Sequence, residues 1–493
     1  MSIELIAHPE QESNYSFPDV LLSLKNKLDQ SVNQNRFKAS NPDLYPPKKA
    51  EVYFEIGKEL FYSAKIYEAI ESFQQALKGK SDFHDARIFL IKAYEKISAI
   101  KKAEEHLFLL QNQRNLNLKQ QLKVHYYAAL LHYRNHEYEK CRNILENVVT
   151  DFSEALIKAS MLFLFAKVND KLSDFHTAFM YFKQANQKRL DEAQSSEIQK
   201  ESQKYLDSVD LAKQWFSKKR VSNWQHLNAN RNSTQPVFLV GFPRSGTTLL
   251  GQALNAHSKI TTIDERPVHN QIDRDFFGTE EHFARLDEWS EPKSRDYQKN
   301  FWTKIDEQIP ERTGKYLVIF KLPLLIPHLA AIQRIFPGAK IIVALRDPRD
   351  VLLSNFMQDY ELNRQMYLML NLKTVYELYH KVMGLYLHFK KVLPLNFIEI
   401  RYENLIKNFQ DETTRLLRFL GLDWEKSIMQ YHIKARKELI LTPSYTQVVQ
   451  PIYGNSIGRW QNYAPYLSEF IPGLKFFIDK FGYRETVLTE ENR

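Results

Sequence analysis

One stretch near the middle of the chain, PVFLVGFPRSGTTLLGQALNAH beginning at Pro236, constrains the fold more than any other. It opens with a short apolar run typical of a β-strand, continues through a loop bracketed by Gly241 and Gly246, and ends in a helical pattern. Two glycines around four residues, between a strand and a helix, are typical of a loop whose backbone N–H groups cradle a phosphate. The alternative is a helix N-terminus with purely structural glycines.

The loop departs from that of nucleoside-triphosphate enzymes in an informative way. Thr247 stands where the phosphate-binding lysine is expected, and Arg244 lies inside the loop. A kinase needs that lysine on the β- and γ-phosphates and a following hydroxyl on Mg²⁺. The loop therefore predicts a metal-free anion site, made by Arg244, Ser245, Gly246, Thr247 and Thr248.

Short β-branched runs alternate with helical periods through the C-terminal half. We expect strands at Pro236–Val240, Tyr316–Phe320, Lys340–Leu345 and Asn396–Ile400. Strands that alternate with helices predict a parallel sheet with right-handed crossovers.

A second strand–turn–helix element, AKIIVALRDPRDVLLSNF, offers another pair of anion ligands. Arg346 closes its strand and Ser354 lies in the following helix, so both can point to the carboxyl edge of the sheet. An arginine gives a two-pronged contact to a phosphate and a serine adds a hydrogen bond. Taken alone, the pair is equally compatible with a surface helix cap.

A repeat occupies the N-terminal half. A pattern of small and aromatic positions, carried by Tyr53, Gly57, Ala69 and Phe73 in the first unit, recurs from starts at Ala50, His84, Leu122 and Ala159, which are 34, 38 and 37 residues apart. Close crossing of two antiparallel helices needs small residues where the backbones approach. The pattern resembles tetratricopeptide repeats and predicts an α-solenoid, whose groove would hold a peptide or partner. A plain helical bundle is the alternative. Cys141 falls on the small-residue phase and is expected to pack rather than react.

Together these patterns predict an α plus α/β chain: an N-terminal extension (1–44), a tetratricopeptide-like helical domain (45–190), a helical linker (191–232) and a P-loop-like α/β domain with a central parallel sheet (233–487). The single cysteine, with no signal peptide or membrane span recognised, predicts a cytoplasmic location. The net charge of +9 is dispersed, with no basic block that would suit nucleic acid.

From Pro236 to Tyr483 the chain resembles the sulfotransferase family. GFPRSGTTLL matches the family's 5′-phosphosulfate loop and RDPRDVLLSN its 3′-phosphate element; RYENLIKN and QVVQPIYGNSIGRWQNY match later blocks. Joined to tetratricopeptide-like repeats, the domain resembles a bacterial type of sulfotransferase. The resemblance implies 3′-phosphoadenosine-5′-phosphosulfate as co-substrate, with Arg346 and Ser354 on the 3′-phosphate.

Within the family, the domain is most similar to tyrosylprotein sulfotransferases. That similarity implies Glu265 as the catalytic base, with Arg244, Lys321 and Ser444 stabilising charge on the donor. Tyr402 then matches an adenine-contacting tyrosine. Arg459, which stands where the animal enzymes have lysine, is also expected to bind the donor. The run Asp264-Glu265-Arg266-Pro267 departs from the family's usual one, and the paired cysteines are absent. His269 and His328 are rival bases, and an ion pair with a neighbouring arginine is the alternative for Glu265.

The expected function is transfer of a sulfuryl group to an acceptor hydroxyl, that of a protein tyrosine docked by the repeat groove. The alternatives are a saccharide or small-molecule acceptor, a P-loop nucleotide kinase and a non-catalytic repeat scaffold. The repeats could instead form a homodimer.

Overall fold

The computed structural model describes residues 46–193, 196–225, 227, 235–264, 268–308, 317–435, 448, 452, 454 and 456–483. The chain divides into two units, Met1–Leu172 and Ser173–Arg493, and each is described here by itself.

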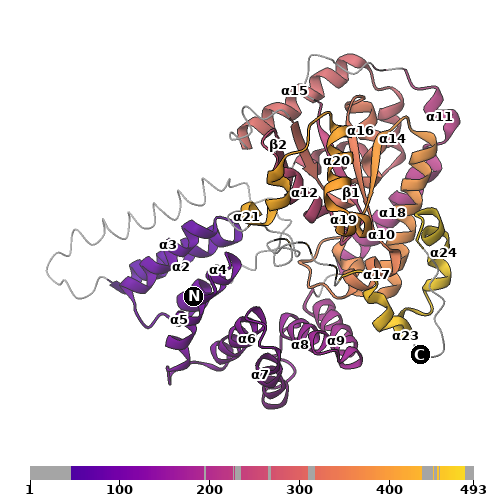
Figure 1. The fold of residues 1–493 in the computed structure, drawn as a ribbon. Helices are drawn as coiled ribbons and strands as arrows, with labels where there is room; N and C mark the ends of the chain where they lie inside the picture. Colours follow the sequence, from indigo (N-terminus) through magenta and orange to yellow (C-terminus); the bar gives the residue numbers. More distant parts are fainter. Residues whose placement is uncertain are drawn as a thin grey trace, which may run out of the picture. The chain divides into compact units, whose positions relative to one another are not determined.

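The described part of the first unit is helical (Figure 1). Its helices are α2 (Pro46–Tyr62), α3 (Ile66–Gly79), α4 (His84–Lys96), α5 (Ile100–Gln111), α6 (Leu118–Arg134), α7 (Tyr138–Asp151) and α8 (Ala159–Lys171). Each helix packs against the next in chain order, and α2, α4, α6 and α8 also contact one another in turn. The helices therefore stack as successive pairs. Their assignment to the tetratricopeptide class stays a prediction.

The same turn closes the first helix of each pair. Ala64, Ser98 and His136 have positive φ angles of 61°, 59° and 62°, and Ser173, which begins the second unit, has 64°. Hydrogen bonds run back across these turns from Lys65 to Leu60, from Ala99 to Tyr94 and from Glu137 to His132. A left-handed residue spanned by such a bond is the Schellman ending of a helix. The four turns are separated by 34, 38 and 37 residues, as the sequence repeats are.

Close packing within the first pair explains the small residues. A Cβ added at Gly57 would lie 2.5 Å from Cε1 of Phe73, so only glycine admits that ring. Phe73 and Ala69 are fully buried. Cys141 is buried as well, and burial raises the pKa of its thiol to about 12, as expected for a packing residue.

The second unit is built around a parallel sheet. The strands are β1 (Val237–Gly241), β2 (Ile260–Asp264), β3 (Leu317–Lys321), β4 (Lys340–Leu345) and β5 (Asn396–Arg401), in the order β2-β3-β1-β4-β5. Every pairing is parallel. The sequence located four of these strands to within a residue at each end. It missed β2, an edge strand whose ITTI run carries the β-branched signal for only a few residues.

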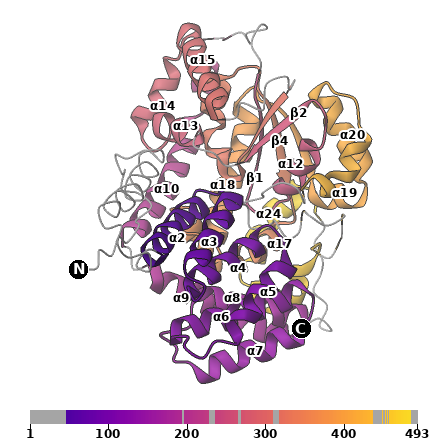
Figure 2. The ribbon, with the colours of Figure 1, turned by 90° about the vertical axis from the view of Figure 1, so that its left-hand side faces the viewer.

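Helices cover both faces of this sheet (Figure 2). The helices described in this unit are α9 (Phe175–Ala193), α10 (Ser196–Trp215), α11 (Lys218–Ser222), α12 (Thr247–Asn255), α13 (Val268–Phe276), α14 (Glu280–Asp287), α15 (Glu291–Gln308), α16 (Leu329–Ile335), α17 (Pro348–Phe356), α18 (Leu372–Val392), α19 (Tyr402–Lys407), α20 (Phe409–Leu420), α21 (Tyr431–Ala435), α23 (Ala464–Leu467) and α24 (Ile471–Lys480). Short 3₁₀ segments are η3 (Pro323–His328), η4 (Met366–Leu370), η5 (Lys426–Gln430) and η6 (Arg459–Tyr463).

Alternation along β1 assigns its two faces. Leu239 belongs to a core shared with α12 and α20. Phe238 points to the opposite face, where its ring centroid lies 6.0 Å from that of Phe336, after α16. On leaving the sheet, the chain places Phe242 5.0 Å from Tyr379 of α18. The sheet is therefore buried on both faces, as parallel sheets are, and only its edges and strand ends are left to carry a site.

Helices α9 and α10 are integral to this unit. Asn186 of α9 donates a hydrogen bond to the carbonyl of Phe356 at 2.9 Å, and Phe179 stacks on Tyr466 with centroids 3.8 Å apart. Helix α10 packs along α18. Among the described residues, no helix is both long and apolar enough to cross a bilayer.

Candidate active site

The loop between β1 and α12 has the backbone that its glycines predict. Gly246 has φ +92°, and a Cβ there would lie 2.6 Å from the ring of Tyr402. A Cβ on Gly241 would lie 2.6 Å from the carbonyl oxygen of Ala344 in β4. Arg244 also has a positive φ, of 69°, which costs a non-glycine residue about 1 kcal/mol. Two close approaches and one strained residue therefore define the shape of this loop.

The loop leads directly into a helix N-terminus. Helix α12 begins at Thr247, so its first-turn N–H groups are directed towards the loop. Ser245, Thr247 and Thr248 are buried. This combination of a helix start, hydroxyl side chains and a loop arginine is chemically suited to a phosphate or sulfate group.

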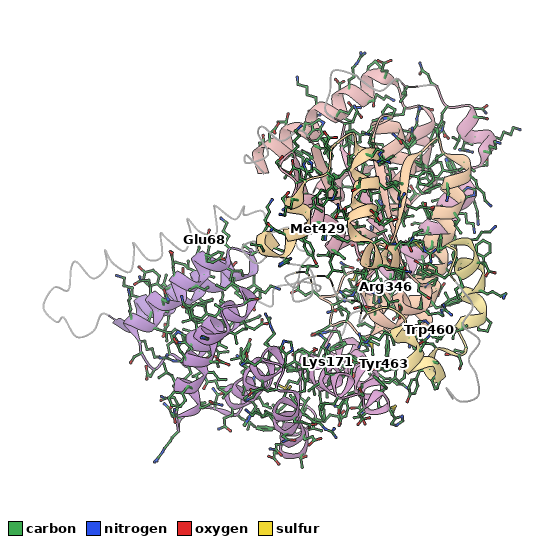
Figure 3. The ribbon with its side chains drawn as sticks, in the orientation of Figure 1. Glu68, Lys171, Arg346, Met429, Trp460 and Tyr463 are labelled. Atoms are coloured by element: carbon green, nitrogen blue, oxygen red, sulfur yellow. The ribbon has the colours of Figure 1, made fainter. Side chains whose placement is uncertain are left out.

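The second predicted element meets this loop directly. Arg244 Nε donates a hydrogen bond to Ser354 Oγ of α17 at 3.1 Å. Arg346 Nη1 donates to the carbonyl oxygen of Arg244 at 3.0 Å (Figure 3 labels Arg346). Asn355, beside Ser354, donates to the carbonyl of Pro243 at 3.0 Å. The two motifs that the sequence predicts to bind anions are thus in direct contact at the carboxyl ends of β1 and β4.

Tyr402 closes a third side. It follows β5, and its ring lies against Gly246. The guanidinium carbon of Arg346 is 4.9 Å from the ring centroid, a cation–π distance. Tyr402 therefore lies beside both the loop and the second arginine.

Lys321 ends β3 on the other side of β1. It is 1 % exposed and pairs in register with Leu239 of β1 and Asp264 of β2. Its Cγ lies 3.7 Å from where a Cβ on Gly251 of α12 would be. Burying a lysine is costly unless its ammonium group is paired and hydrogen-bonded. This lysine lies at the carboxyl edge of the sheet, next to the loop between β1 and α12.

Arg459 is placed through its neighbours. It begins η6, and the N–H groups of Gly458 and Trp460 on either side of it donate to Asp350 at 2.8 and 2.9 Å. Asp350 is one turn along from Arg346, whose Nη2 is 3.8 Å from its carboxylate. The segment that carries Arg459 is therefore attached to the start of α17, next to Arg346.

Three sequence predictions fall wholly or partly outside the described residues. Glu265 and Ser444 lie outside the described residues, and for His269 only the backbone is described. The described backbone does end β2 at Asp264, opposite Lys321, and Glu265 is the next residue in the chain.

The structure describes the side chain of His328, the alternative base. It is 2 % exposed, its Nε2 lies 2.8 Å from Asp273 Oδ1, and its ring is 4.8 Å from that of Phe277. Arg364 pairs with the other oxygen of Asp273 at 2.5 Å. Burial opposes ionisation of Asp273, but His328 and Arg364 outweigh it and hold the pKa of that carboxyl well below its usual value.

Sequence reasoning missed the acidic residues that organise the arginines. Asp350 was not singled out, nor was Asp347, which accepts two bonds from the Arg349 side chain at 2.9 and 2.7 Å. Glu403 accepts the backbone N–H of Asp347 at 3.0 Å. The available signal was the alternation of charge in RDPRD, because buried arginines need acidic partners.

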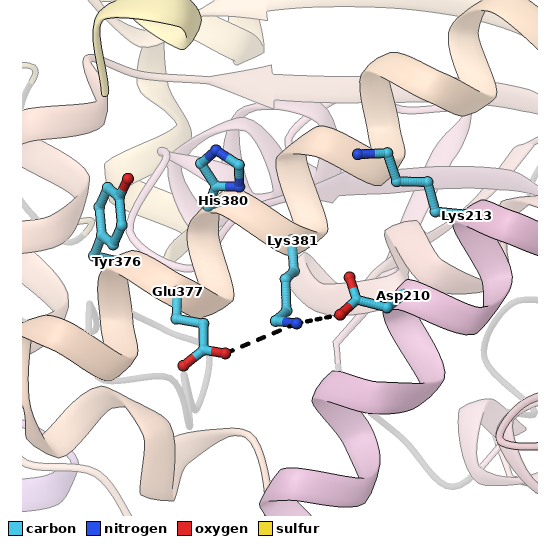
Figure 4. A pocket seen from close by; sticks show the side chains of 6 residues that line it. All are labelled: Asp210, Lys213, Tyr376, Glu377, His380 and Lys381. Atoms are coloured by element: carbon cyan, nitrogen blue, oxygen red, sulfur yellow. Dashed lines mark hydrogen bonds and ion pairs between the residues drawn. The ribbon is translucent and has the colours of Figure 1, made fainter. Parts of the chain in front are cut away.

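A separate pocket of about 320 Å³ lies between α10 and α18 (Figure 4). It is lined by Asp210, Lys213, Tyr376, Glu377, His380 and Lys381. Lys381 pairs with both acids. Burial, followed by the charges of Lys213 and Lys381, lowers the pKa of His380. The pocket shares no residue with the loop site, and its two lysines and two acids balance in charge. The described residues contain no group of three or more His, Cys, Asp or Glu side chains placed to hold a metal ion.

The second unit is an α/β domain whose parallel sheet is followed, after β1, by a glycine-flanked loop and a helix start. Residues 236–426 match the model of the sulfotransferase family. An uncharacterised protein of Aquifex aeolicus is 27% identical over 326 residues, which cover 64% of this chain and 41% of that protein. The chain thus spans less than half of that relative's length.

Two further proteins are similar to part of this chain. A putative protein-tyrosine sulfotransferase of Caenorhabditis briggsae is 25% identical over 46% of this chain and 81% of its own length. The sulfotransferase domain of the olefin synthase of Synechococcus PCC 7002 is 20% identical over 48% of this chain and 90% of that one, with a TM-score of 0.35.

Proposed function

We propose that the second unit transfers a sulfuryl group from 3′-phosphoadenosine-5′-phosphosulfate to an acceptor hydroxyl. The observation that carries the proposal is the contact between the two anion-binding motifs, through the Arg244–Ser354 and Arg346–Arg244 hydrogen bonds. Two guanidinium groups beside a helix N-terminus suit a ligand with two separate anionic ends. Such a donor carries its phosphosulfate at one end of the nucleoside and its 3′-phosphate at the other.

In the proposed reaction, the acceptor oxygen forms a bond to sulfur as the bond from sulfur to the bridging oxygen breaks. The electron pair stays on the bridging oxygen, and the acceptor proton passes to the Glu265 carboxylate. Arg244 and Lys321 would stabilise the charge that develops on the leaving oxygen, and Ser444 would add a hydrogen bond. The register of β2 and β3 supports this assignment, because it brings the residue before Glu265 opposite Lys321.

A protein tyrosine is the acceptor that we favour. Relatives named as protein-tyrosine sulfotransferases support it. A phenol has a pKa of about 10 and a carboxylate one of about 4, so proton transfer to Glu265 is uphill unless cations stabilise the phenolate. Arg244 and Lys321 supply that charge in the proposal. A saccharide or small-molecule hydroxyl is the alternative acceptor.

The first unit is proposed to dock the polypeptide acceptor, or a protein that delivers it. Its support is the stacking of successive helix pairs, since solenoids of this kind present extended surfaces to peptides. Assembly of a homodimer is the alternative use of the same surface.

Two experiments distinguish the proposed function from its alternatives. The full chain would be incubated with donor labelled in its sulfate group and with a host lysate, with and without EDTA. Label in protein that is released as sulfotyrosine supports the proposal, whereas label in polysaccharide or small molecules changes the acceptor. Titration with 3′,5′-adenosine bisphosphate should show binding that EDTA leaves unchanged. Tight ATP binding that needs Mg²⁺ would instead identify a kinase.

A further inference from the structure

Asp350 joins two parts of the second unit that the sequence separates widely. Its side chain, in the first turn of α17, is 0 % exposed. Oδ2 accepts the N–H of Gly458 at 2.8 Å and Oδ1 accepts the N–H of Trp460 at 2.9 Å. Both carboxylate oxygens are therefore used to hold the backbone of a segment more than one hundred positions further along the chain.

That segment needs an acceptor from outside itself. Gly458 is the N-cap residue of η6 and has φ +69°. A glycine has no side chain to accept hydrogen bonds from the first N–H groups of η6. Buried first-turn N–H groups are costly when they have no partner, and a carboxylate at a helix start satisfies them and suits its positive end. Asp350 supplies two such bonds at once, so it determines where η6 begins.

A second attachment lies next to the first. Trp460 is buried, and the guanidinium carbon of Arg349 lies 4.1 Å from its ring centroid. Arg346 donates a hydrogen bond to the carbonyl of Ser456. Three residues at or just before the start of α17, Arg346, Arg349 and Asp350, thus hold both the backbone and the tryptophan of the C-terminal segment.

Arg459 is the residue between the two N–H donors that Asp350 binds. With the residues on both sides of it held, the Cα of Arg459 is fixed relative to α17. The same carboxylate is 3.8 Å from Arg346 Nη2. Asp350 therefore sets the relative positions of two arginines, Arg346 and Arg459, that the sequence predicts to bind the donor.

We propose that Asp350 is a positioning residue for donor binding, which holds Arg459 and Arg346 together without touching the donor itself. The expected effect on donor binding rests on the proposed function, whereas the placement of Arg459 by Asp350 does not depend on it. Loss of Asp350 should release the start of η6 and so weaken the hold on the nucleotide, leaving acceptor binding unaffected.

The structural part is tested first, without any ligand. Hydrogen exchange of the 456–463 segment would be compared in the full-length wild type, Asp350→Asn and the control Asp287→Asn. Asp287 also binds an arginine and an indole N–H, of Arg220 and Trp224, but none of the donor-site residues. We expect exchange in this segment to rise about tenfold or more in Asp350→Asn alone. Equal exchange in all three proteins overturns the inference, whatever the protein binds.

The functional part uses a double-mutant cycle with 3′,5′-adenosine bisphosphate as the probe. Asp350→Asn should weaken its binding about tenfold, raise the KM for donor and leave the KM for acceptor unchanged. In an Arg459→Ala background the same substitution should cost much less, because Asp350 acts through Arg459. Additive losses would overturn the coupling.

Asp350→Glu covers the case in which the asparagine variant fails to fold. It keeps two acceptor oxygens, so partial recovery of affinity is expected, and an affinity no better than that of an Asp350→Ala variant counts against positioning. A wild-type chain that binds no adenosine bisphosphate, yet shows the expected exchange, would reject the proposed function and leave the placement of Arg459 by Asp350 intact.

Discussion

Arg244 Nε and Ser354 Oγ, 110 residues apart in the chain, lie 3.1 Å apart in the structure. This bond connects the loop after β1 to the helix after β4. Because Arg346 also donates to the carbonyl of Arg244, the loop arginine is held through both its side chain and its backbone. Residues assigned to opposite ends of a donor therefore depend on one another before any ligand is bound.

The first prediction compares Arg346, which directly follows β4, with Ser354 of α17. Ser354→Ala should weaken binding of 3′,5′-adenosine bisphosphate by about 1.5 kcal/mol, and Arg346→Ala by about 3 kcal/mol, because hydrogen bonds to charged groups fall in this range. Calorimetric titration measures both. Arg415→Ala removes an exposed arginine paired with Glu412 and should leave binding unchanged. Wild-type affinity in Arg346→Ala would contradict the assignment.

The second prediction concerns Gly246. An alanine there would adopt a positive φ and bring its Cβ to 2.6 Å from the Tyr402 ring. We expect Gly246→Ala to lower the free energy of unfolding by about 1–2 kcal/mol from backbone strain alone and to weaken nucleotide binding. The control is Gly454→Ala, since a Cβ at Gly454 would have no atom within 4 Å. Identical melting temperatures and affinities for both variants would show that the loop tolerates the change.

The third prediction separates binding from chemistry. Glu265→Gln keeps the size of the side chain but removes its capacity to accept a proton. Turnover should fall by about 10²–10⁴-fold, while the affinity for 3′,5′-adenosine bisphosphate stays near that of the wild type. Steady-state rates and calorimetry give the two numbers. A fully active Glu265→Gln enzyme would redirect the base to His269 or His328.

The fourth prediction follows from the lowered pKa of Asp273. A carboxylate whose folded-state pKa is depressed stabilises the fold above its unfolded value of about 4, and this contribution is lost as the pH falls further. Asp273→Asn should therefore lower the free energy of unfolding by about 2 kcal/mol at pH 7, below the full effect for a buried pair because Asp273 is partly exposed.

Urea unfolding of Asp273→Asn at pH 7 and at pH 3 measures this dependence, and the gap to wild type should shrink at the lower pH. Asp207→Asn serves as the control, because Asp207 has an exposed hydrogen bond to Gln203. A gap that is the same at both pH values would show that the ionised carboxylate contributes nothing.

The fifth prediction concerns the repeats and where to remove them. A truncation near Asn223 would take away α9 and α10, which pack within the second unit, so the cut belongs between Leu172 and Ser173. The chain from Ser173 onward should keep its nucleotide affinity and its activity on a small phenol but lose activity on the protein acceptor. Unchanged activity on that acceptor would mean that the first unit serves assembly.

Local patterns in the sequence were sufficient for much of the fold. The glycines of the loop, the four apolar strand runs and the spacing of the helix pairs all reflect rules that act within a few residues. Gly57 depends on a residue of the following helix, because the Phe73 ring occupies the space of its missing Cβ, and the repeat pattern carries that pairing. The edge strand β2 was missed because its apolar run is short. Two of the four residues in ITTI are threonines, so the hydrophobic pattern is weak there.

The sequence by itself determined the chemistry available to this protein: a loop with an arginine in place of the expected lysine, a second arginine and serine after another strand, and a charge at the end of β3. Only the tertiary structure decided how these groups meet. Parallel pairing places the carboxyl ends of β1, β3 and β4 side by side, so Arg244, Lys321 and Arg346 gather at one edge. It also selected the partners of the charged groups, such as Asp350 with the N–H groups beside Arg459, because a buried carboxylate must find donors wherever the chain brings them.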